Sequence, residues 1–405
     1  MASRSIVVIG AGPAGTFAAI AAKKQAPDAA VTLLSDEAGE PYEKPPLSKA
    51  VLTGKARPSD APIAGPGGVA AHGVSLASNV RCTAIEPSQR RLVLQDGSPL
   101  SYDALVIATG ARVRELPVLP ASTPGVYYLR TEEDAARLKA ALGSSRELLV
   151  VGGGLIGLEV AASAAELGVG TTVVEAAPHL MARVCYAEIA GRVEAVHRAR
   201  GVQIRLNSTV THAEAREDGR VAVETADGDH FAVDAIVVGT GAVPDDRLAA
   251  AAGLATRDGV VVDERCRTSD PLIYAAGDVA RLPGPAGLVR LENWRHALDH
   301  GTVAGRNAAG AEESYRTVPS FWSEQYDLYI QGIGWPAAEA ERVERPLAGG
   351  AALVMEVTDD RIVYALGINA RRELAVVRRL IERAVPVDPM ALADPARPLQ
   401  TLLPR

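Results

Sequence analysis

A glycine motif that occurs twice constrains this chain more than any other feature. The motif is G-x-G-x-x-G, and its two copies, residues 10–15 and 152–157, each follow an apolar run directly. In a strand-turn-helix unit the first glycine permits a tight turn and the second lets a pyrophosphate approach the backbone. The third glycine lets the helix pack on the strand, and the helix N-terminus attracts the phosphates. Two copies therefore predict that one chain binds two dinucleotides.

Each motif lies in a strand-helix-strand pattern, over residues 5–36 and 147–175. A carboxylate at the end of the second strand commonly holds a ribose. In the first unit this residue is Asp36 or Glu37, and the sequence leaves the choice open. In the second unit it is Glu175, which is followed by two alanines with no nearby arginine for a 2′-phosphate. Glu175 therefore favours NADH over NADPH.

The length of 405 residues exceeds what one ordinary core supports. We expect an α/β fold with two Rossmann-like dinucleotide-binding domains and a small C-terminal α+β domain. Apolar segments near residues 104 and 234 each close a sheet, and the second returns the chain to the first domain. The expected domains are residues 1–111 with 241–315, residues 112–240, and residues 316–405.

Composition excludes several classes of function. The net charge of −7 argues against nucleic acid as a partner. Every apolar run is shorter than the roughly 20 residues of a membrane span, so we expect no membrane anchor. The N-terminus enters a strand almost at once and leaves no room for a signal peptide, which predicts a cytoplasmic protein. Cys82, Cys185 and Cys266 are far apart in sequence, so we expect no metal site and incidental thiols.

Two further segments carry charged residues of uncertain role. Residues 41–49 contain three prolines, which stiffen the backbone, and the lysines Lys44 and Lys49. These lysines could hold an anionic group or lie on a solvated loop, and composition alone favours the loop. Asp278 ends the apolar run 273–279 at an expected helix start, where it could face a ligand or cap the helix.

These residues together resemble a known family. The paired glycine motifs, Ala108-Thr109-Gly110 and residues 274–278 resemble the glutathione-reductase-like flavoprotein superfamily. Within it, residues 41–49, 157–159 and 322–325 are similar to the NADH-dependent ferredoxin reductases of bacterial oxygenase systems, of the biphenyl dioxygenase and P450-serving types. The resemblance implies an FAD that is reduced by NADH and oxidised one electron at a time by a [2Fe–2S] ferredoxin.

The resemblance also implies site residues. Lys49 should pair with Glu159 beside the flavin, because a buried charge requires a partner, and Trp322 joins them as the third catalytic candidate. Lys44 stands where many relatives have arginine, which removes bidentate geometry. The residues expected at the two cofactors are Gly10, Gly12, Ala14, Gly15, Asp36, Glu37, Lys44, Lys49, Cys82, Ala108, Thr109, Gly110, Arg130, Gly152, Gly154, Leu155, Ile156, Glu159, Glu175, Arg183, Gly239, Thr240, Gly241, Gly277, Asp278, Glu292, Asn293 and Trp294.

The electron acceptor has alternatives. A rubredoxin or a quinone could replace the ferredoxin, and a non-catalytic interaction protein with a redox fold is a third reading. No cysteine occurs between residues 1 and 81, so the thiol intermediate of the disulfide-reducing relatives is not expected. An acidic ferredoxin would need a local basic patch on this acidic protein. The expected docking residues are Arg290, Arg295, Arg378 and Arg379.

Overall fold

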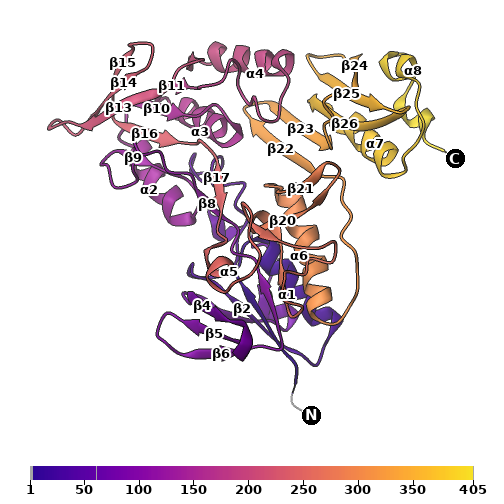
Figure 1. Ribbon diagram of the computed structural model, residues 1–405. Helices are drawn as coiled ribbons and strands as arrows, with labels where there is room; N and C mark the ends of the chain where they lie inside the picture. The colour runs from indigo at the N-terminus through magenta and orange to yellow at the C-terminus, as the bar shows by residue number, and fades with distance from the viewer. Residues whose placement is uncertain (1–2, 61, 405) are drawn as a thin grey trace. The chain divides into compact units, whose positions relative to one another are not determined.

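The computed structural model describes residues 3–60 and 62–404, which form two compact units of mixed α/β structure (Figure 1). Unit 1 consists of Met1–Glu43, Pro58–Arg112 and Ala242–Pro319, and unit 2 of Lys44–Arg57, Val113–Gly241 and Ser320–Arg405. The α/β class predicted from the sequence is confirmed. The three-domain division stays a prediction. Residues 44–57, which carry both lysines of the proline-rich segment, belong to unit 2.

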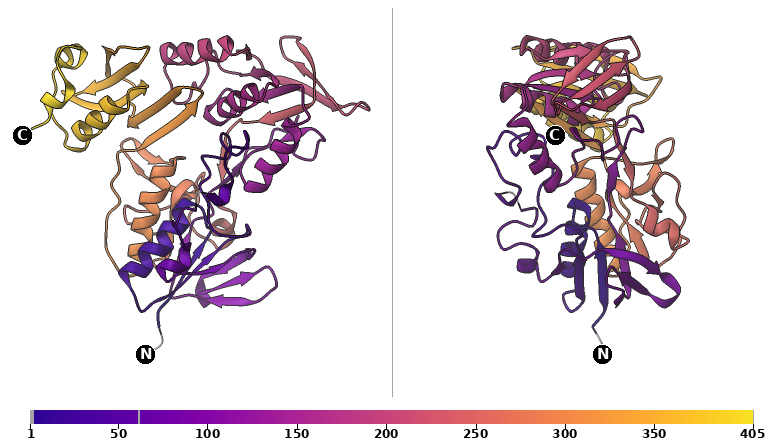
Figure 2. Two further views of the ribbon diagram at one scale, coloured as in Figure 1. Left: turned by 180° about the vertical axis from the view of Figure 1, so that it is seen from behind. Right: turned by 90° about the vertical axis from the view of Figure 1, so that its left-hand side faces the viewer.

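Unit 1 is built on a five-stranded parallel sheet. Its elements are β1 (Ser5–Ile9), α1 (Pro13–Gln25), β2 (Ala30–Leu34), β3 (Ser75–Ala77), β7 (Ala104–Ile107), β19 (Ile273–Ala275) and α6 (Trp294–Ala308). The strand order is β19-β7-β1-β2-β3, and β1 is almost wholly buried because apolar side chains cover both faces of a parallel sheet. Helices α1 and α6 lie side by side (Figure 2). A Cβ at Gly301 or Gly305 of α6 would come within 2.1 Å of a carbonyl of α1, so glycine permits this close packing.

Unit 1 also contains two small three-stranded sheets, one antiparallel and one mixed. One contains β4 (Cys82–Glu86), β5 (Arg91–Leu94) and β6 (Pro99–Ser101). The other places β20 (Ala280–Gly284) between β18 (Val260–Val261) and β21 (Gly287–Val289), although its β18–β20 pair is parallel. The remaining elements are the helix α5 (Arg247–Ala251) and the strands β8 (Ala111–Val113) and β17 (Ala242–Pro244), which stand where the chain passes from one unit to the next.

Unit 2 repeats the parallel arrangement around the second glycine motif. Its elements are β9 (Val126–Tyr127), α2 (Glu132–Leu142), β10 (Glu147–Val151), α3 (Leu155–Glu166), β11 (Gly170–Val174), α4 (Ala187–Ala199), β12 (Gln203–Arg205) and β16 (Ala235–Val238). The strand order is β12-β11-β10-β16-β9. Two hairpins in this unit form an antiparallel sheet of β13 (Val210–Ala215), β14 (Val221–Thr225) and β15 (His230–Val233).

The C-terminal part of unit 2 is an antiparallel sheet with one long helix. Its elements are β22 (Ser320–Gln325), β23 (Leu328–Gly334), β24 (Glu341–Pro346), β25 (Ala352–Thr358), β26 (Arg361–Ile368), α7 (Arg371–Glu382) and α8 (Pro389–Ala393). The strand order is β22-β23-β26-β25-β24. Helix α7 buries Leu374, Val377 and Leu380, as its apolar spacing predicts. One hydrophobic core includes Leu158 of α3 and Leu366 of β26, so this sheet packs with the parallel part of the same unit.

No helix in residues 3–60 and 62–404 is long and apolar enough to cross a membrane.

Candidate functional site

The first glycine motif of unit 1 leaves space where a phosphate group would lie. Gly10 has a φ of +99°, and a Cβ there would come within 2.3 Å of the Ala108 carbonyl oxygen. A Cβ at Gly15 would come within 1.7 Å of the Gly10 carbonyl oxygen. A Cβ at Gly12, in contrast, would have no neighbour within 4 Å. The outer glycines are therefore required for packing, whereas the middle glycine faces open space.

The second motif of unit 2 has the same geometry. Gly152 has a φ of +107°, and a Cβ there would come within 2.7 Å of the Gly239 carbonyl oxygen. A Cβ at Gly157 would come within 2.1 Å of the Gly152 carbonyl oxygen, while Gly154 has no neighbour nearer than 4.0 Å. No side chain caps the N-terminus of α1 or α3, so the first backbone N–H groups of each helix can receive a phosphate. Both turns fit a dinucleotide.

Glu175 lies directly beside the second glycine turn. Its carboxylate accepts hydrogen bonds from the backbone N–H of Gly153 at 2.6 Å and of Ala177 at 2.7 Å. These two donors hold the carboxylate at the carboxyl end of β11, where a ribose is bound in folds of this class. The structure therefore places an anionic group next to the turn, as the coenzyme prediction requires.

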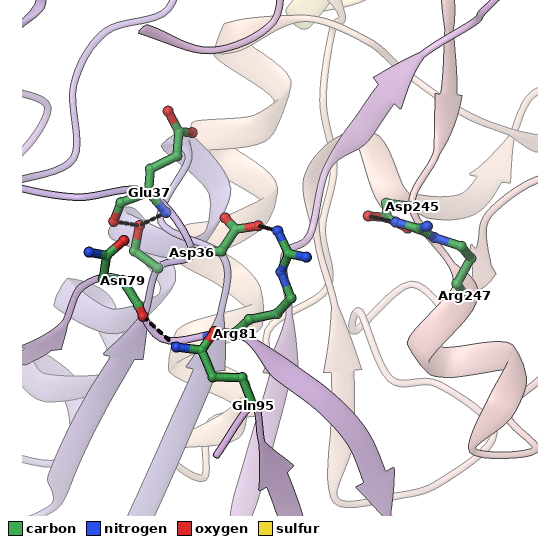
Figure 3. A network of polar contacts seen from close by, with 8 residues as sticks. Asp36, Glu37, Asn79, Arg81, Gln95, Asp245 and Arg247 are labelled. Carbon is green, nitrogen blue, oxygen red and sulfur yellow. Dashed lines mark hydrogen bonds and ion pairs between the residues drawn. The ribbon is translucent and has the colours of Figure 1, made fainter. Parts of the chain in front are cut away.

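The two acidic candidates of unit 1 have different partners, and Figure 3 shows the ion pair of Asp36 with Arg81. Asp36 is exposed and lies 3.6 Å from the Arg81 guanidinium. Glu37 is half-buried, accepts a hydrogen bond from the Tyr42 hydroxyl, and has its backbone N–H bonded to Ser35. Both carboxylates lie just after β2, so the choice between them as the ribose ligand stays open.

The ion pair expected between Lys49 and Glu159 is present in unit 2. Lys49 Nζ lies 3.0 Å from Glu159 Oε2, and the two side chains are 21% and 4% exposed. The same carboxylate accepts hydrogen bonds from Ser48 and, at 2.6 Å, from Ser323 Oγ. Three donors therefore surround one buried carboxylate, which stabilises its negative charge.

Other expected residues of unit 2 have contacts of their own. Lys44 Nζ donates to the backbone carbonyl of Arg130 at 3.4 Å. Arg183 is exposed, and a Cβ on Gly241 would come within 3.1 Å of its guanidinium, so these two expected cofactor residues lie together. Trp322 is half-buried on β22 and alternates with Ser323, which faces Glu159.

A cavity of about 520 Å³ adjoins Arg183. Tyr186, Arg342 and Glu356 also line it, and Glu356 is 3% exposed. The Tyr186 hydroxyl donates to Glu356 Oε1 at 2.5 Å, and the backbone N–H of Ala337 donates to Oε2 at 2.8 Å. This buried carboxylate therefore has partners within the protein.

The loop residues expected at the flavin in unit 1 surround the start of α6. Asn293 caps this helix by accepting a hydrogen bond from the His296 N–H at 2.9 Å. Trp294, the next residue, hydrogen-bonds Glu43, whose pKa is raised mainly by burial although this bond lowers it. Asp278 lies in the short 3₁₀ helix Gly277–Val279 directly after β19, so the helix that the sequence predicts to start here is a single 3₁₀ turn.

The thiols of the described chain are not arranged for redox chemistry. Cys82, Cys185 and Cys266 are free and buried. Burial raises the pKa of Cys82 to about 11 and that of Cys185 to about 12, so neither is a reactive thiolate near neutral pH. Cys82, expected near the cofactors, contributes to an apolar core of unit 1.

Two buried histidines were missed in the sequence analysis. His296 and His300 lie one turn apart on α6, with ring centroids 4.8 Å apart. They are 1% and 0% exposed. His296 Nδ1 lies 2.7 Å from the Tyr315 hydroxyl, and His300 Nδ1 accepts from the Gly277 N–H at 3.3 Å. Neither Nε2 has a hydrogen-bond partner among the described residues. Their i, i+4 spacing was the available signal, but it did not reveal burial.

Arg290 does not support the docking surface expected from the sequence. Its side chain is 11% exposed and contacts both Asp258 and Glu292. The charge is therefore neutralised inside unit 1, which corrects the expectation. Arg295 is 55% exposed but is paired with Asp299 at 2.7 Å.

Two parallel sheets, each with an open glycine turn at an uncapped helix, define a two-dinucleotide oxidoreductase. Comparison with protein families agrees, since residues 4–301 match the pyridine nucleotide-disulphide oxidoreductase model and residues 320–403 match a reductase C-terminal model. The chain belongs to the pyridine nucleotide-disulphide oxidoreductase family.

Individual relatives cover nearly the whole chain. The ferredoxin–NAD(+) reductase component of an anthranilate 1,2-dioxygenase system from Burkholderia cepacia is 36% identical over 100% of both chains. A rubredoxin–NAD(+) reductase from Pseudomonas putida is 37% identical over 82% of this chain and 86% of its own. Among solved structures, the covalent complex of putidaredoxin reductase with putidaredoxin has a chain that matches with a TM-score of 0.94 and 33% identity, over 99% of this chain and 98% of that one.

Proposed function

We propose that this protein is an NADH-dependent FAD reductase that delivers electrons to a [2Fe–2S] ferredoxin serving an oxygenase. The observation that carries the proposal is the pair of glycine turns, each open at its middle glycine and each at an uncapped helix. The similarity to ferredoxin reductase components supports the acceptor. A cytoplasmic location is part of the proposal, and cell fractionation would test it.

The residues of each unit have assigned tasks. FAD would lie on the turn of Gly10 and Gly12 in unit 1, and NADH on the turn of Gly154 with Glu175 at its ribose. Bound FAD would supply the chemistry that lets a two-electron donor reduce a one-electron carrier. Lys49, Glu159 and Trp322 are proposed beside the flavin ring, as the resemblance implies. Because the three thiols are free and buried, electron transfer to the acceptor involves no cysteine intermediate.

The test compares acceptors with the FAD-loaded protein. NADH-dependent reduction of cytochrome c is measured alone, with a [2Fe–2S] ferredoxin, and with a rubredoxin. The proposal expects strong stimulation by ferredoxin and little by rubredoxin. Stimulation by rubredoxin alone would favour the second candidate, which rests on the rubredoxin reductase relative. Failure to oxidise NADH with any acceptor would contradict both.

Coenzyme choice should depend on Glu175. Its carboxylate is held beside the Gly153 N–H and would repel the 2′-phosphate of NADPH. We expect kcat/KM for NADH to exceed that for NADPH by at least about tenfold, which is roughly 1.4 kcal/mol. Glu175→Ala should bring the two kcat/KM values closer together, because it should lower kcat/KM for NADH more than kcat/KM for NADPH. The exposed Glu214→Ala in the same unit is the control, and equal kcat/KM values in the unmodified protein would refute the assignment.

Acceptor docking should depend on exposed arginines of α7. This helix buries its apolar face against the sheet, so Arg379 is exposed. Arg378 is less available, because it is 29% exposed and lies 3.6 Å from Glu382. Arg379→Glu should lower kcat/KM for ferredoxin by about tenfold at low salt and weaken its salt dependence.

The matched control for this prediction is Arg216→Glu, which makes the same charge change at an exposed position between β13 and β14. Stopped-flow reduction of the flavin by NADH should be unchanged in both variants. If Arg379→Glu slows flavin reduction by NADH and leaves ferredoxin reduction normal, α7 does not dock the ferredoxin and the prediction is wrong.

A further inference from the structure

A continuous chain of hydrogen bonds runs from Glu159 into the interior of unit 2. Ser323 Oγ donates to Glu159 Oε1 at 2.6 Å, and Gln325 Nε2 donates to Ser323 Oγ at 3.1 Å. Gln325 Oε1 lies 2.9 Å from His197 Nε2, and His197 Nδ1 lies 3.4 Å from the Tyr326 hydroxyl. Four side chains are thus linked in series to the carboxylate that contacts Lys49.

The members come from separate elements, and all of them except the half-buried Tyr326 are buried. Glu159 lies on α3, His197 near the end of α4, and Ser323 with Gln325 on β22. Ser323 and Gln325 point to one face because side chains alternate along a strand. Ser323, Gln325 and His197 are each 0% exposed. Solvent cannot replace a missing partner there, so every bond in the series has to be made within the protein.

The charge on Glu159 sets the direction of every bond in this series. An ionised carboxylate only accepts, so Ser323 must donate to it and must therefore accept from Gln325. The amide of Gln325 then presents its oxygen to His197, which has to carry its proton on Nε2. His197 Nδ1 is left to accept from Tyr326. A reversed amide or the other imidazole tautomer would turn the Ser323 hydroxyl away from Glu159.

His197 remains neutral in this position. Burial lowers its pKa, and the hydrogen bond to Gln325 opposes that effect. A neutral ring with one donor and one acceptor suits the series, because each nitrogen then has a partner of the right kind.

We propose that His197 and Gln325 are positioning residues, which act through Ser323 to hold the Glu159 carboxylate directed at Lys49. This inference deepens the proposed function, on which its kinetic consequence rests. The hydrogen-bond direction itself is independent of that function. The series gives the C-terminal sheet a defined role, since β22 supplies one of the three donors to the carboxylate.

The first test reads the direction of the series without using activity. Ring ¹⁵N NMR of histidine-labelled, FAD-loaded protein distinguishes the two neutral tautomers, and loss of the signal in His197→Gln assigns it. We expect His197 to carry its proton on Nε2. In Glu159→Gln the amide can donate as well as accept, so the constraint is lost and the His197 resonances should shift. A proton on Nδ1 in the unmodified protein would overturn the proposal.

The second test measures how substitutions in the series change the rate of flavin reduction by NADH. Gln325→Met and His197→Leu should each slow flavin reduction by NADH by about tenfold, the loss expected for one hydrogen bond to a charged group. His197→Gln, whose amide can replace the Nε2 donor, should stay within about threefold of the original rate. Thr171→Val removes a buried hydroxyl of the same unit outside the series and should leave the rate unchanged.

The outcomes separate the inference from the function on which it rests. Rates in Gln325→Met and His197→Leu equal to that of Thr171→Val would show that the series is only structural. A rate in His197→Gln as low as that in His197→Leu would also contradict the proposed positioning role. If NADH does not reduce the flavin at all, the proposed function fails, while the tautomer measurement still decides the direction of the series. Circular dichroism and FAD content identify variants that fold.

Discussion

Replacing Lys49 with methionine is expected to cost this protein about 3 kcal/mol of unfolding free energy at pH 8. The substitution keeps the length of the side chain and removes the charge that pairs with Glu159 at 3.0 Å. Removing one partner of a buried pair typically costs about 3–5 kcal/mol. The lower end applies here because Lys49 is 21% exposed and Glu159 keeps two hydroxyl donors. Urea unfolding of both proteins measures the change in unfolding free energy.

A matched surface pair makes this prediction specific. Lys55→Met is the control, since Lys55 pairs with Glu166 where both side chains are more than half exposed, and its loss should cost less than about 1 kcal/mol. Equal losses in the two variants would mean that Glu159 is not a buried charge that depends on Lys49.

The same substitution should also slow flavin reduction by NADH on the order of 10²-fold, the scale of losing one preorganised electrostatic group. Lys55→Met should leave this rate unchanged. Stopped-flow measurement at saturating NADH separates the rate from coenzyme binding. An unchanged rate in Lys49→Met would remove the pair from the proposed catalytic group while leaving its structural role intact.

Acid should destabilise the protein through His296 and His300. Burial lowers the pKa of His300 to about 3 and places that of His296 well below its usual range. The unfolded chain therefore binds more protons than the folded one around and below pH 6.5. The unfolding free energy is highest well above this pH and decreases as the pH is lowered. His300 contributes a slope that approaches about 1.4 kcal/mol per pH unit below pH 6.5, or roughly 2.3 kcal/mol between pH 6.5 and 4.5.

A neutral replacement measures this contribution separately from the carboxylates. His300→Gln keeps an oxygen that can accept from the Gly277 N–H, but it cannot be protonated. Its unfolding free energy should decline less steeply with falling pH, by about 1.4 kcal/mol per unit below pH 6.5. A slope in His300→Gln equal to that of the original protein would show that His300 is not held neutral in the folded state.

Local patterns predicted much of the fold. The glycine turns, the strands before them and the helices after them follow from apolar periodicity and from the need for positive φ at Gly10 and Gly152. Glu175 was found by its place at the end of a strand. These features depend on residues close in sequence, so their geometry is nearly complete before the chain packs.

Charge partners were harder to predict, because they depend on residues far apart in the chain. The pair of Lys49 and Glu159 was expected only through a family resemblance. Arg290, expected as a docking residue, is instead enclosed by Asp258 and Glu292. The exposure of Arg290 depends on how the small sheet of unit 1 packs, and this packing cannot be predicted from the residues next to Arg290 in the sequence.

By itself, the sequence determined that the chain has two dinucleotide turns, where each lies, and that a carboxylate follows the second. Only the tertiary structure decided that Ser323, Gln325 and His197 form one series ending on Glu159. It also decided that His296 and His300 are buried with no hydrogen-bond partner for either Nε2 in residues 3–60 and 62–404. The physical reason is that turns arise from backbone conformation within a few residues. Burial and hydrogen-bond partners arise only when α3, α4 and β22, separated by up to 164 positions between Glu159 and Ser323, pack against one another.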